Sequence, residues 1–257
     1  MLECVILAGG LGTRMRPHTD RVPKALLPVC GRPFADWQLQ WLAAQGVHSV
    51  VLCVGHLGEL IEAFVGDGQR WGLEVRYARE EGPLLGTAGA IRQALDLGIA
   101  GEAFFVLFGD SYLRLDLADV EVAFRQCGRP VLMTVLHNEG RWDRSNVVFE
   151  AGMVTRYDKH ADPRPQEMTF VDYGLSAMTR RVVEQHVRAG ESAELAPMLH
   201  SLSLRGDIAG YVVTDRFYEI GSPEGLADLE VFLTGGQSSS PGNDARLRRP
   251  TSPEGLP

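Results

Sequence analysis

A glycine-rich segment near the start of the chain, followed by several cations, constrains the fold more than any other part. The segment runs Leu7-Ala8-Gly9-Gly10-Leu11-Gly12-Thr13-Arg14-Met15-Arg16-Pro17, and the apolar stretch before it, Glu3 to Leu7, predicts a short strand. Glycines let the backbone approach a ligand closely and adopt positive φ, so amide groups can surround an anion. Arginine and lysine bind phosphate oxygens, and the region supplies Arg14, Arg16, Arg21 and Lys24. These features predict a triphosphate site.

The same region resembles the signature of the sugar-1-phosphate nucleotidyltransferases (NDP-sugar pyrophosphorylases), approximately GGxGTRLxPxT followed by PKxxxPV. The matching residues are Gly9, Gly10, Gly12, Thr13, Arg14, Pro17, Thr19, Pro23, Lys24, Pro28 and Val29. The resemblance implies transfer of a nucleoside monophosphate from an NTP to a sugar 1-phosphate, with release of pyrophosphate. A dinucleotide fingerprint would need glycine at Met15, and no P-loop dipeptide Gly-Lys occurs.

By this resemblance, Arg14 and Lys24 are the catalytic pair that binds the departing phosphates. The implied nucleotide contacts in the glycine-rich loop are Leu7, Ala8, Gly9, Gly10, Gly12 and Thr13. A second segment, running from Glu81 to Gly89, resembles the family's E-x-P-L-G-T-A-G sequence with one residue inserted. It adds Glu81, Gly86, Thr87 and Ala88 as contacts near the base.

Two carboxylates are candidates for a metal site. Asp110 follows the apolar run 104–108 through Gly109, and a carboxylate at the end of a buried strand is either a cap or a metal ligand. The resemblance assigns Asp110 to a metal, and it assigns a second ligand near the end of the chain, usually aspartate. The matching position is Glu219, and the implied cofactor is Mg²⁺, which prefers oxygen ligands. The longer side chain of Glu219 departs from the family pattern.

The resemblance also implies contacts to the acceptor sugar phosphate. Lys159 occupies the place of the family's E-K-P lysine, and Gly174 and Asp172 occupy that of its N-A-G segment. Asn146 replaces a more usual Tyr-Gly pair, so we expect acceptor recognition to differ from the family pattern.

Alternating strand and helix signals in the first half predict an α/β fold, a doubly wound and mostly parallel (mixed) sheet with helices on both faces. This Rossmann-like nucleotidyltransferase fold would carry a small sugar-binding insertion. The predicted strands are 3–7, 47–54, 73–78, 103–108, 131–136, 146–150, 153–157, 170–178 and 208–213. The predicted helices are 33–45, 57–65, 87–97, 179–188, 193–204 and 223–233. Ligands of such sheets bind at the carboxyl ends of the strands.

Composition indicates one domain over residues 1–235, with a nucleotide-binding part of about 1–130 and a sugar-binding part of about 131–220. The chain has 257 residues, 45% of them hydrophobic, which suffices for one sizeable core. Residues 236–257 are rich in Gly, Ser and Pro and are expected to form a disordered tail. We expect no membrane span and no signal peptide, because no long apolar run or basic leader occurs.

Charge and cysteine content restrict the partners and the compartment. The net charge is −8, which argues against nucleic acid and anionic membranes as partners. The four cysteines show no C-x-x-C spacing, so we expect reduced thiols in a cytoplasmic protein. The expected partners are an NTP and a sugar 1-phosphate. Assembly into a homo-oligomer is left open by the sequence.

The finer function has several alternatives. The segments 31–34 and 45–59 look similar to the guanylyl-transferring branch that acts on mannose-type heptose or mannose 1-phosphate, and we expect guanylyl transfer first. Uridylyl or cytidylyl transfer to another sugar 1-phosphate stays open. A catalytically silent relative that senses nucleotides or sugar phosphates is the alternative from another class.

Overall fold

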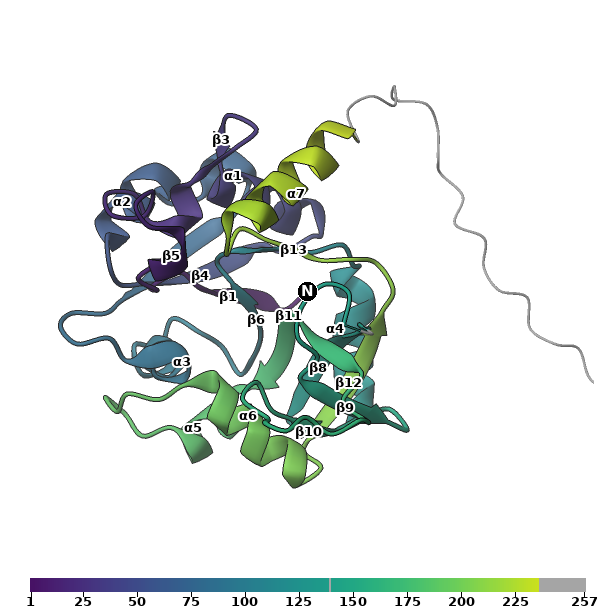
Figure 1. Ribbon diagram of the computed structural model, residues 1–257. Helices are drawn as coiled ribbons and strands as arrows, with labels where there is room; N and C mark the ends of the chain where they lie inside the picture. The colour runs from purple at the N-terminus through teal and green to yellow at the C-terminus, as the bar shows by residue number, and fades with distance from the viewer. Residues whose placement is uncertain (139, 236–257) are drawn as a thin grey trace, which may run out of the picture.

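The computed structural model describes residues 1–138 and 140–235, and within them nine strands form one mixed sheet (Figure 1). The strand order is β5-β4-β1-β6-β11-β8-β12-β10-β9. These strands are β1 (Glu3–Leu7), β4 (Ser49–Val54), β5 (Glu74–Arg79), β6 (Ala103–Phe108), β8 (Val131–His137), β9 (Val147–Glu150), β10 (Met153–Tyr157), β11 (Phe170–Thr179) and β12 (Ile208–Val213).

The sheet has a parallel part and a part with mixed strand directions. β5, β4, β1 and β6 are parallel. The near-continuous apolar sequences of β4, β1 and β6 suit strands that are covered on both faces, whereas the edge strand β5 mixes apolar and charged residues. β11 is antiparallel to both β6 and β8, whereas β12 is parallel to β8. The antiparallel hairpin β9–β10 turns through Ala151 and Gly152, both at positive φ, which suits a tight hairpin turn.

Helices cover both faces of the sheet (Figure 1). One face packs against α1 (Phe34–Ala44), α2 (Gly58–Val65) and α4 (Leu117–Cys127), and the other packs against α3 (Gly86–Asp96), α5 (Arg180–His186) and α6 (Leu195–Leu204). Successive residues of β1 alternate between the two cores: Cys4 and Ile6 pack in the first, Val5 and Leu7 in the second. The predicted fold class is therefore confirmed.

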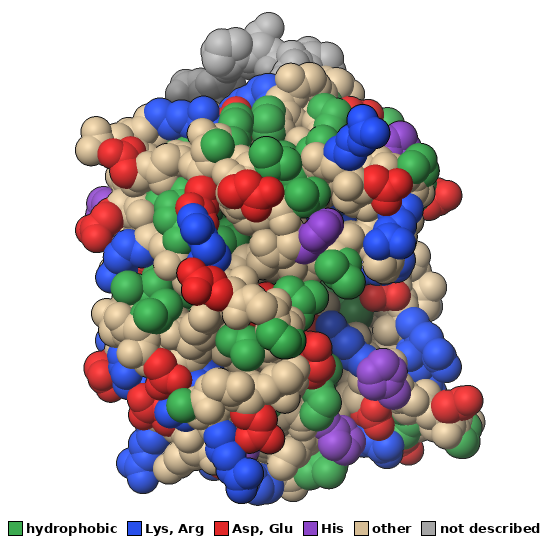
Figure 2. Space-filling model, turned by 90° about the vertical axis from the view of Figure 1, so that its left-hand side faces the viewer, with side chains coloured by type: hydrophobic (Ala, Val, Ile, Leu, Met, Phe, Trp, Pro, Cys, Tyr) green, Lys and Arg blue, Asp and Glu red, His purple; other side chains and the backbone are tan. Residues whose placement is uncertain are grey.

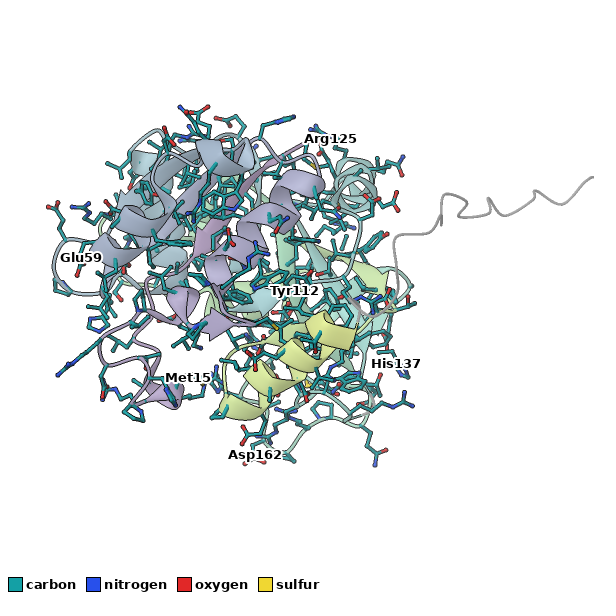
Figure 3. All side chains as sticks on the ribbon, turned by 90° about the horizontal axis from the view of Figure 1, so that it is seen from above. Met15, Glu59, Tyr112, Arg125, His137 and Asp162 are labelled. Atoms are coloured by element: carbon teal, nitrogen blue, oxygen red, sulfur yellow. The ribbon has the colours of Figure 1, made fainter. Side chains whose placement is uncertain are left out.

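A third, smaller core lies under the last helix, α7 (Pro223–Gly235). Met15, which follows the glycine-rich loop, packs there against Ile220, Leu229 and Leu233, and Figure 3 shows it beside α7. Two short ladders complete the fold: β2 (Pro28–Val29) with β3 (Arg32–Pro33), and β7 (Ser111–Tyr112) with β13 (Tyr218–Glu219). The third core thus joins the start of the chain to its last described helix.

Most predicted elements agree with the structure to within two residues at each end, whereas α4 and the short β7–β13 ladder were not predicted. The disordered tail predicted over residues 236–257 lies outside the described residues. None of the helices within residues 1–138 and 140–235 is long and apolar enough to cross a membrane.

Candidate active site

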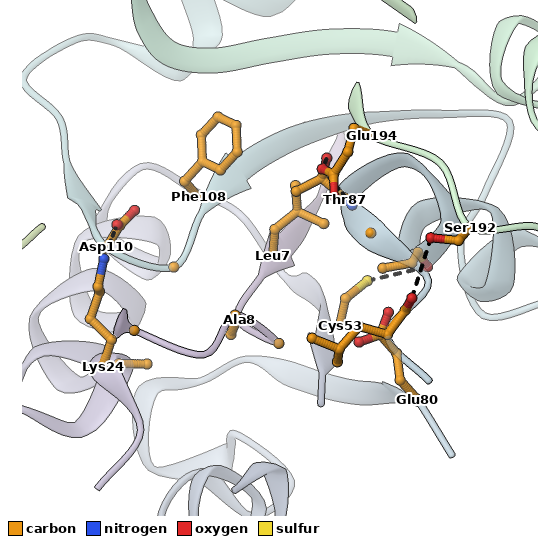
Figure 4. Close-up of a pocket in the computed structure, with 18 residues that line it drawn as sticks. Leu7, Ala8, Lys24, Cys53, Glu80, Thr87, Phe108, Asp110, Ser192 and Glu194 are labelled. Atoms are coloured by element: carbon orange, nitrogen blue, oxygen red, sulfur yellow. Dashed lines mark hydrogen bonds and ion pairs between the residues drawn. The ribbon is translucent and has the colours of Figure 1, made fainter. Parts of the chain in front are cut away.

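A cavity of about 310 Å³ opens at the carboxyl ends of β1 and β6. The face in Figure 2 is hollowed right of its centre, where hydrophobic, cationic and acidic side chains meet. The cavity is lined by Leu7, Ala8, Gly9, Gly10, Gly12, Lys24, Ala25, Cys53, Glu80, Leu84, Gly86, Thr87, Ala90, Phe108, Gly109, Asp110, Ser192 and Glu194 (Figure 4). Its position is the one expected for a ligand site in an open α/β sheet.

The glycine-rich loop forms one wall because its residues tolerate close backbone contacts. A Cβ at Gly9 would lie 3.1 Å from both Glu80 Oε2 and the amide nitrogen of Gly55, so a side chain there would crowd the wall. Gly12 has φ +61°, a left-handed conformation that favours glycine, and its carbonyl accepts a hydrogen bond of 2.8 Å from Thr19 Oγ1. Thr19 is buried and thereby fixes the end of the loop.

Lys24 and Asp110 meet in the cavity (Figure 4). Lys24 begins the short 3-10 helix Lys24–Leu26, and Asp110 follows β6, so the fold brings together residues far apart in the sequence. The distance between Lys24 Nζ and Asp110 Oδ2 is 2.8 Å, and about a fifth or less of each side chain is exposed. A cation of the type that binds phosphate and a carboxylate of the type that binds Mg²⁺ therefore lie side by side in the site.

Glu219 lies next to Asp110 through the β7–β13 ladder, in which Glu219 pairs with Ser111. The amide of Ile220 also donates a 3.0 Å hydrogen bond to the Asp110 carbonyl. Burial, and next the negative charges of Asp110 and Asp143, raise the pKa of Glu219 to about 7 against the opposing effect of nearby cations. Two carboxylates that repel each other in a partly buried site are a donor set that a divalent cation would stabilise.

The two carboxylates fit a Mg²⁺ ion, because Mg²⁺ is commonly held by one or two carboxylates together with substrate phosphates. The described residues contain no group of three or more His, Cys, Asp or Glu side chains placed to hold a metal. Arg14 adds a cation on the same side. Its guanidinium is exposed, and a Cβ on Gly221 would lie 3.3 Å from its Nη2.

The second half of the chain closes the opposite wall of the cavity. Thr87 Oγ1 donates a 2.7 Å hydrogen bond to Glu194 Oε2 and accepts one of 2.7 Å from the amide of Leu195. The Ala193 carbonyl accepts from the amides of Ala88 and Gly89. The loop before α6 is thus fastened to the start of α3, which positions Ser192 and Glu194 in the cavity wall.

One expected base contact is displaced by a single residue. Glu81 is exposed to solvent and does not line the cavity, whereas its neighbour Glu80 does. Glu80 Oε1 accepts a 3.0 Å hydrogen bond from the amide of Leu85, and burial raises the pKa of the Glu80 carboxyl. The segment begins with two adjacent glutamates; the motif matches the second, Glu81, whereas the first, Glu80, lines the cavity.

The predicted acceptor residues lie beyond Asp110, on the side of β11. Lys159 Nζ lies 5.3 Å from the ring centre of Phe108, a cavity residue. Gly174 has φ +98°, and a Cβ there would lie 3.3 Å from Ser111 Oγ. Gly174 is therefore next to Ser111, the residue that follows Asp110. The amide of Asp172 donates a 2.9 Å hydrogen bond to Asn146 Oδ1.

Not all predicted residues reach the cavity. Besides Glu81, two of the predicted nucleotide contacts, Thr13 and Ala88, do not line the cavity. The others do: Leu7, Ala8, Gly9, Gly10, Gly12, Gly86 and Thr87. Ala88 is buried in the core, and Thr13 is exposed at the start of a 3-10 turn. The unpredicted lining residues include Glu80, Ser192 and Glu194; the last two had no local motif that could have revealed them.

Comparison with known proteins finds nucleotidyltransferases by family model and by sequence similarity. The family described as Nucleotidyl transferase matches residues 3–146. The N-acetylmuramate alpha-1-phosphate uridylyltransferase of Neisseria meningitidis is 42% identical over 226 residues, which cover 86% of this chain and 94% of that protein. The mannose-1-phosphate guanylyltransferase of Mycobacterium tuberculosis is 30% identical over 245 residues, which cover 93% of this chain and 67% of that protein.

A solved structure agrees in fold. The inositol-1-phosphate CTP transferase from T. maritima aligns with a TM-score of 0.75 and 22% identity, covering 93% of this chain and 97% of that one. At this identity the similarity shows the fold, and the functional argument depends on the sequence relatives and on the site.

Proposed function

The chain belongs to the nucleotidyl transferase family, and from that premise we propose that it transfers a nucleoside monophosphate from an NTP to a sugar 1-phosphate and releases pyrophosphate. The observation that carries the proposal is the junction of Lys24 and Asp110 at 2.8 Å beside the glycine-rich loop. It combines a phosphate-binding cation, a metal-binding carboxylate and an amide-lined wall in one cavity.

Each residue has a role set by charge and place. The glycine-rich loop would bind the triphosphate, and Arg14 and Lys24 would stabilise negative charge on the departing pyrophosphate. Lys159 would hold the acceptor phosphate near Phe108. Asp110 and Glu219 would hold Mg²⁺, which neutralises phosphate charge when bound. One phosphate oxygen of the acceptor then attacks the α-phosphorus in line, a P–O bond forms, and the bond to the departing pyrophosphate breaks.

We propose uridylyl transfer as the first candidate for the base. The observation that favours it is the 42% identity to the uridylyltransferase over 94% of that relative's length. The guanylyl transfer expected from residues 31–34 and 45–59 is the second candidate, supported by the 30% identical guanylyltransferase. Cytidylyl transfer is the third candidate; the CTP transferase with the same fold is 22% identical, which bears on the fold alone.

The test is a matrix of NTPs against sugar 1-phosphates, with pyrophosphate release as the readout and mass spectrometry of the NDP-sugar. UTP, GTP and CTP are each combined with N-acetylmuramate, N-acetylglucosamine, mannose and mannose-type heptose 1-phosphates. UTP should give the highest kcat/KM. A maximum with GTP and mannose or heptose would support the second candidate, and no pyrophosphate in any well would indicate a silent sensor. A Lys24→Ala preparation is the control for contaminating activity.

A further inference from the structure

Two segments near the acceptor side carry cations that the proposed reaction does not use. β11 runs antiparallel to β6, and Leu175 of β11 pairs with Leu107 of β6. The residues of β11 before Leu175 therefore extend past the carboxyl end of β6, on the side where Asp110 lies. Phe170, the first residue of β11, pairs with His137, the last residue of β8. The segments 140–146 and 158–169 therefore lie at the edge of the sheet where the cavity opens.

Arg144 and Arg164 lie close together in these segments. The Nη1 of Arg164 donates a hydrogen bond to the carbonyl oxygen of Ser145, the residue between Arg144 and Asn146. Burial, and next the positive charge of Arg144, lower the pKa of Arg164 against the opposing effect of nearby carboxylates. Two guanidinium groups are thus held within electrostatic range of each other, an arrangement that an anion would stabilise.

Within residues 1–138 and 140–235, neither arginine has a carboxylate within 4.0 Å of its guanidinium nitrogens. Three carboxylates, Asp143, Asp158 and Asp162, attract Arg164 electrostatically, and the first two have other hydrogen-bond partners. Asp158 accepts from Arg156 Nη2 at 3.2 Å and from the amide of His160 at 3.0 Å. Asp143 accepts a 2.6 Å hydrogen bond from the backbone amide of Arg144. The paired guanidinium groups therefore keep hydrogen-bond donors for another anion.

The same segments adjoin the acceptor residues. Asn146 is buried, and its carbonyl accepts a 2.8 Å hydrogen bond from the amide of Asp158, the residue before Lys159. The arginine pair is therefore next to the site of the acceptor, whose own phosphate already has Lys159 as a cationic partner.

We propose that Arg144 and Arg164 bind a carboxylate carried by the acceptor sugar at a position away from its phosphate. This inference rests on the proposed function, because it requires a sugar 1-phosphate in the cavity. It assigns the acceptor to the class of acidic sugar 1-phosphates, and it makes the two arginines specificity-determining residues. They do not contact the reacting phosphorus, so their effect belongs in the KM of the acceptor and not in kcat.

The test compares two acceptors that differ by a carboxylate-bearing lactyl ether, N-acetylmuramate 1-phosphate and N-acetylglucosamine 1-phosphate. Arg144→Gln and Arg164→Gln should each raise the KM of the carboxylated acceptor about tenfold or more, because a charge-assisted hydrogen bond is lost. The kcat of both acceptors and the KM of the neutral acceptor should stay within about twofold. Arg129→Gln, an exposed site before the start of β8 at the opposite edge of the sheet, is the control for loss of one positive charge.

Arg164 also donates a hydrogen bond to the Ser145 carbonyl, so its variant could lose stability as well as a ligand contact. The variant of the exposed Arg144 lacks this ambiguity, and melting curves of both variants separate the two effects. Equal KM changes for both acceptors, or none, would overturn the inference. Turnover of neutral acceptors alone by the parent protein would also overturn it, and would leave nucleotidyl transfer intact. No turnover with any NTP and any acceptor of the matrix would overturn the proposed function together with it.

Discussion

Lys24 and Asp110, 86 residues apart in the sequence, form an ion pair of 2.8 Å at the centre of the candidate active site. Both side chains are largely shielded from solvent, which makes the pair stronger than an exposed one. Each charge therefore fixes the position of the other before any ligand binds. This arrangement couples the proposed phosphate-binding residue to the proposed metal ligand, and the first two predictions separate their roles.

Loss of either phosphate-binding cation should lower turnover strongly. We expect Lys24→Ala and Arg14→Ala each to reduce kcat about 100-fold or more with an unchanged fold, because charge stabilisation of the departing phosphates is lost. Arg129→Ala is the control for loss of a positive charge, since Arg129 is exposed before the start of β8 at the opposite edge of the sheet. Pyrophosphate release at saturating substrate and circular dichroism provide the measurements. Turnover near the parental rate in either variant would show that the residue was assigned wrongly.

Neutral isosteres of the two carboxylates should weaken activation by Mg²⁺. Asp110→Asn and Glu219→Gln should both raise the Mg²⁺ concentration needed for half-maximal turnover, and Asp110 should matter more because its shorter side chain has fewer torsions to order. Glu219→Asp withdraws the carboxylate by one carbon–carbon bond, and Mg²⁺ tolerates little change in ligand distance. That variant should need more Mg²⁺ than the parent. Identical Mg²⁺ titrations for the parent, Glu219→Asp and Glu219→Gln would remove Glu219 from the metal site.

The sequence predicted the elements whose signals are local. β1 and β6 have the predicted bounds because their apolar runs end at glycines or at charged residues. α4 was missed although its pattern was present: Leu117, Val120 and Phe124 form a buried stripe, and Asp116 caps the helix by accepting from the amide of Ala118 at 2.7 Å. This miss was therefore avoidable.

Other parts of the site depend on contacts between distant residues and could not be predicted from local patterns. β7 and β13 have two residues each, too few for any periodicity, and their pairing joins Ser111 to Glu219. Glu194 reaches the cavity because contacts across the two halves of the chain, from Thr87 to Glu194 and from the amide of Ala88 to the Ala193 carbonyl, hold its loop against α3. Motif resemblance located the Asp110 and Lys24 charges, but the walls around them come from tertiary packing.

Glu121 should stabilise the fold in a pH-dependent way. Its side chain is buried, accepts a 2.8 Å hydrogen bond from the amide of Leu2 beside β1, and binds the guanidinium of Arg125. Burial alone would raise the pKa of Glu121, but the hydrogen bonds from Arg125 and Leu2 outweigh it and lower the pKa below its ordinary value of 4.5. Its contribution is therefore complete above that value and is lost as the pH falls through the lower folded-state pKa.

We expect Glu121→Gln to lower the free energy of unfolding by about 1–3 kcal/mol at pH 7, the range for hydrogen bonds to a charged group. The difference from the parent should shrink in urea titrations as the pH is lowered from 5 to 3. Glu74→Gln is the control, because Glu74 is exposed and its ion pair with Arg76 spans 3.8 Å. A pH-independent difference would mean that the charge of Glu121 contributes nothing.

Gly225 should be required for the placement of Glu219. A Cβ at Gly225, in the first turn of α7, would overlap the carbonyl oxygen of Glu219, so either α7 or the Glu219 backbone must move. We expect Gly225→Ala to lower the melting temperature by a few degrees and to raise the Mg²⁺ requirement. In an unconstrained helix the same substitution would stabilise by up to about 1 kcal/mol. Gly235→Ala is the matched control in the same helix, since a Cβ there meets no described atom within 4 Å. A gain in stability for Gly225→Ala with an unchanged Mg²⁺ titration would show that the contact relaxes without moving Glu219.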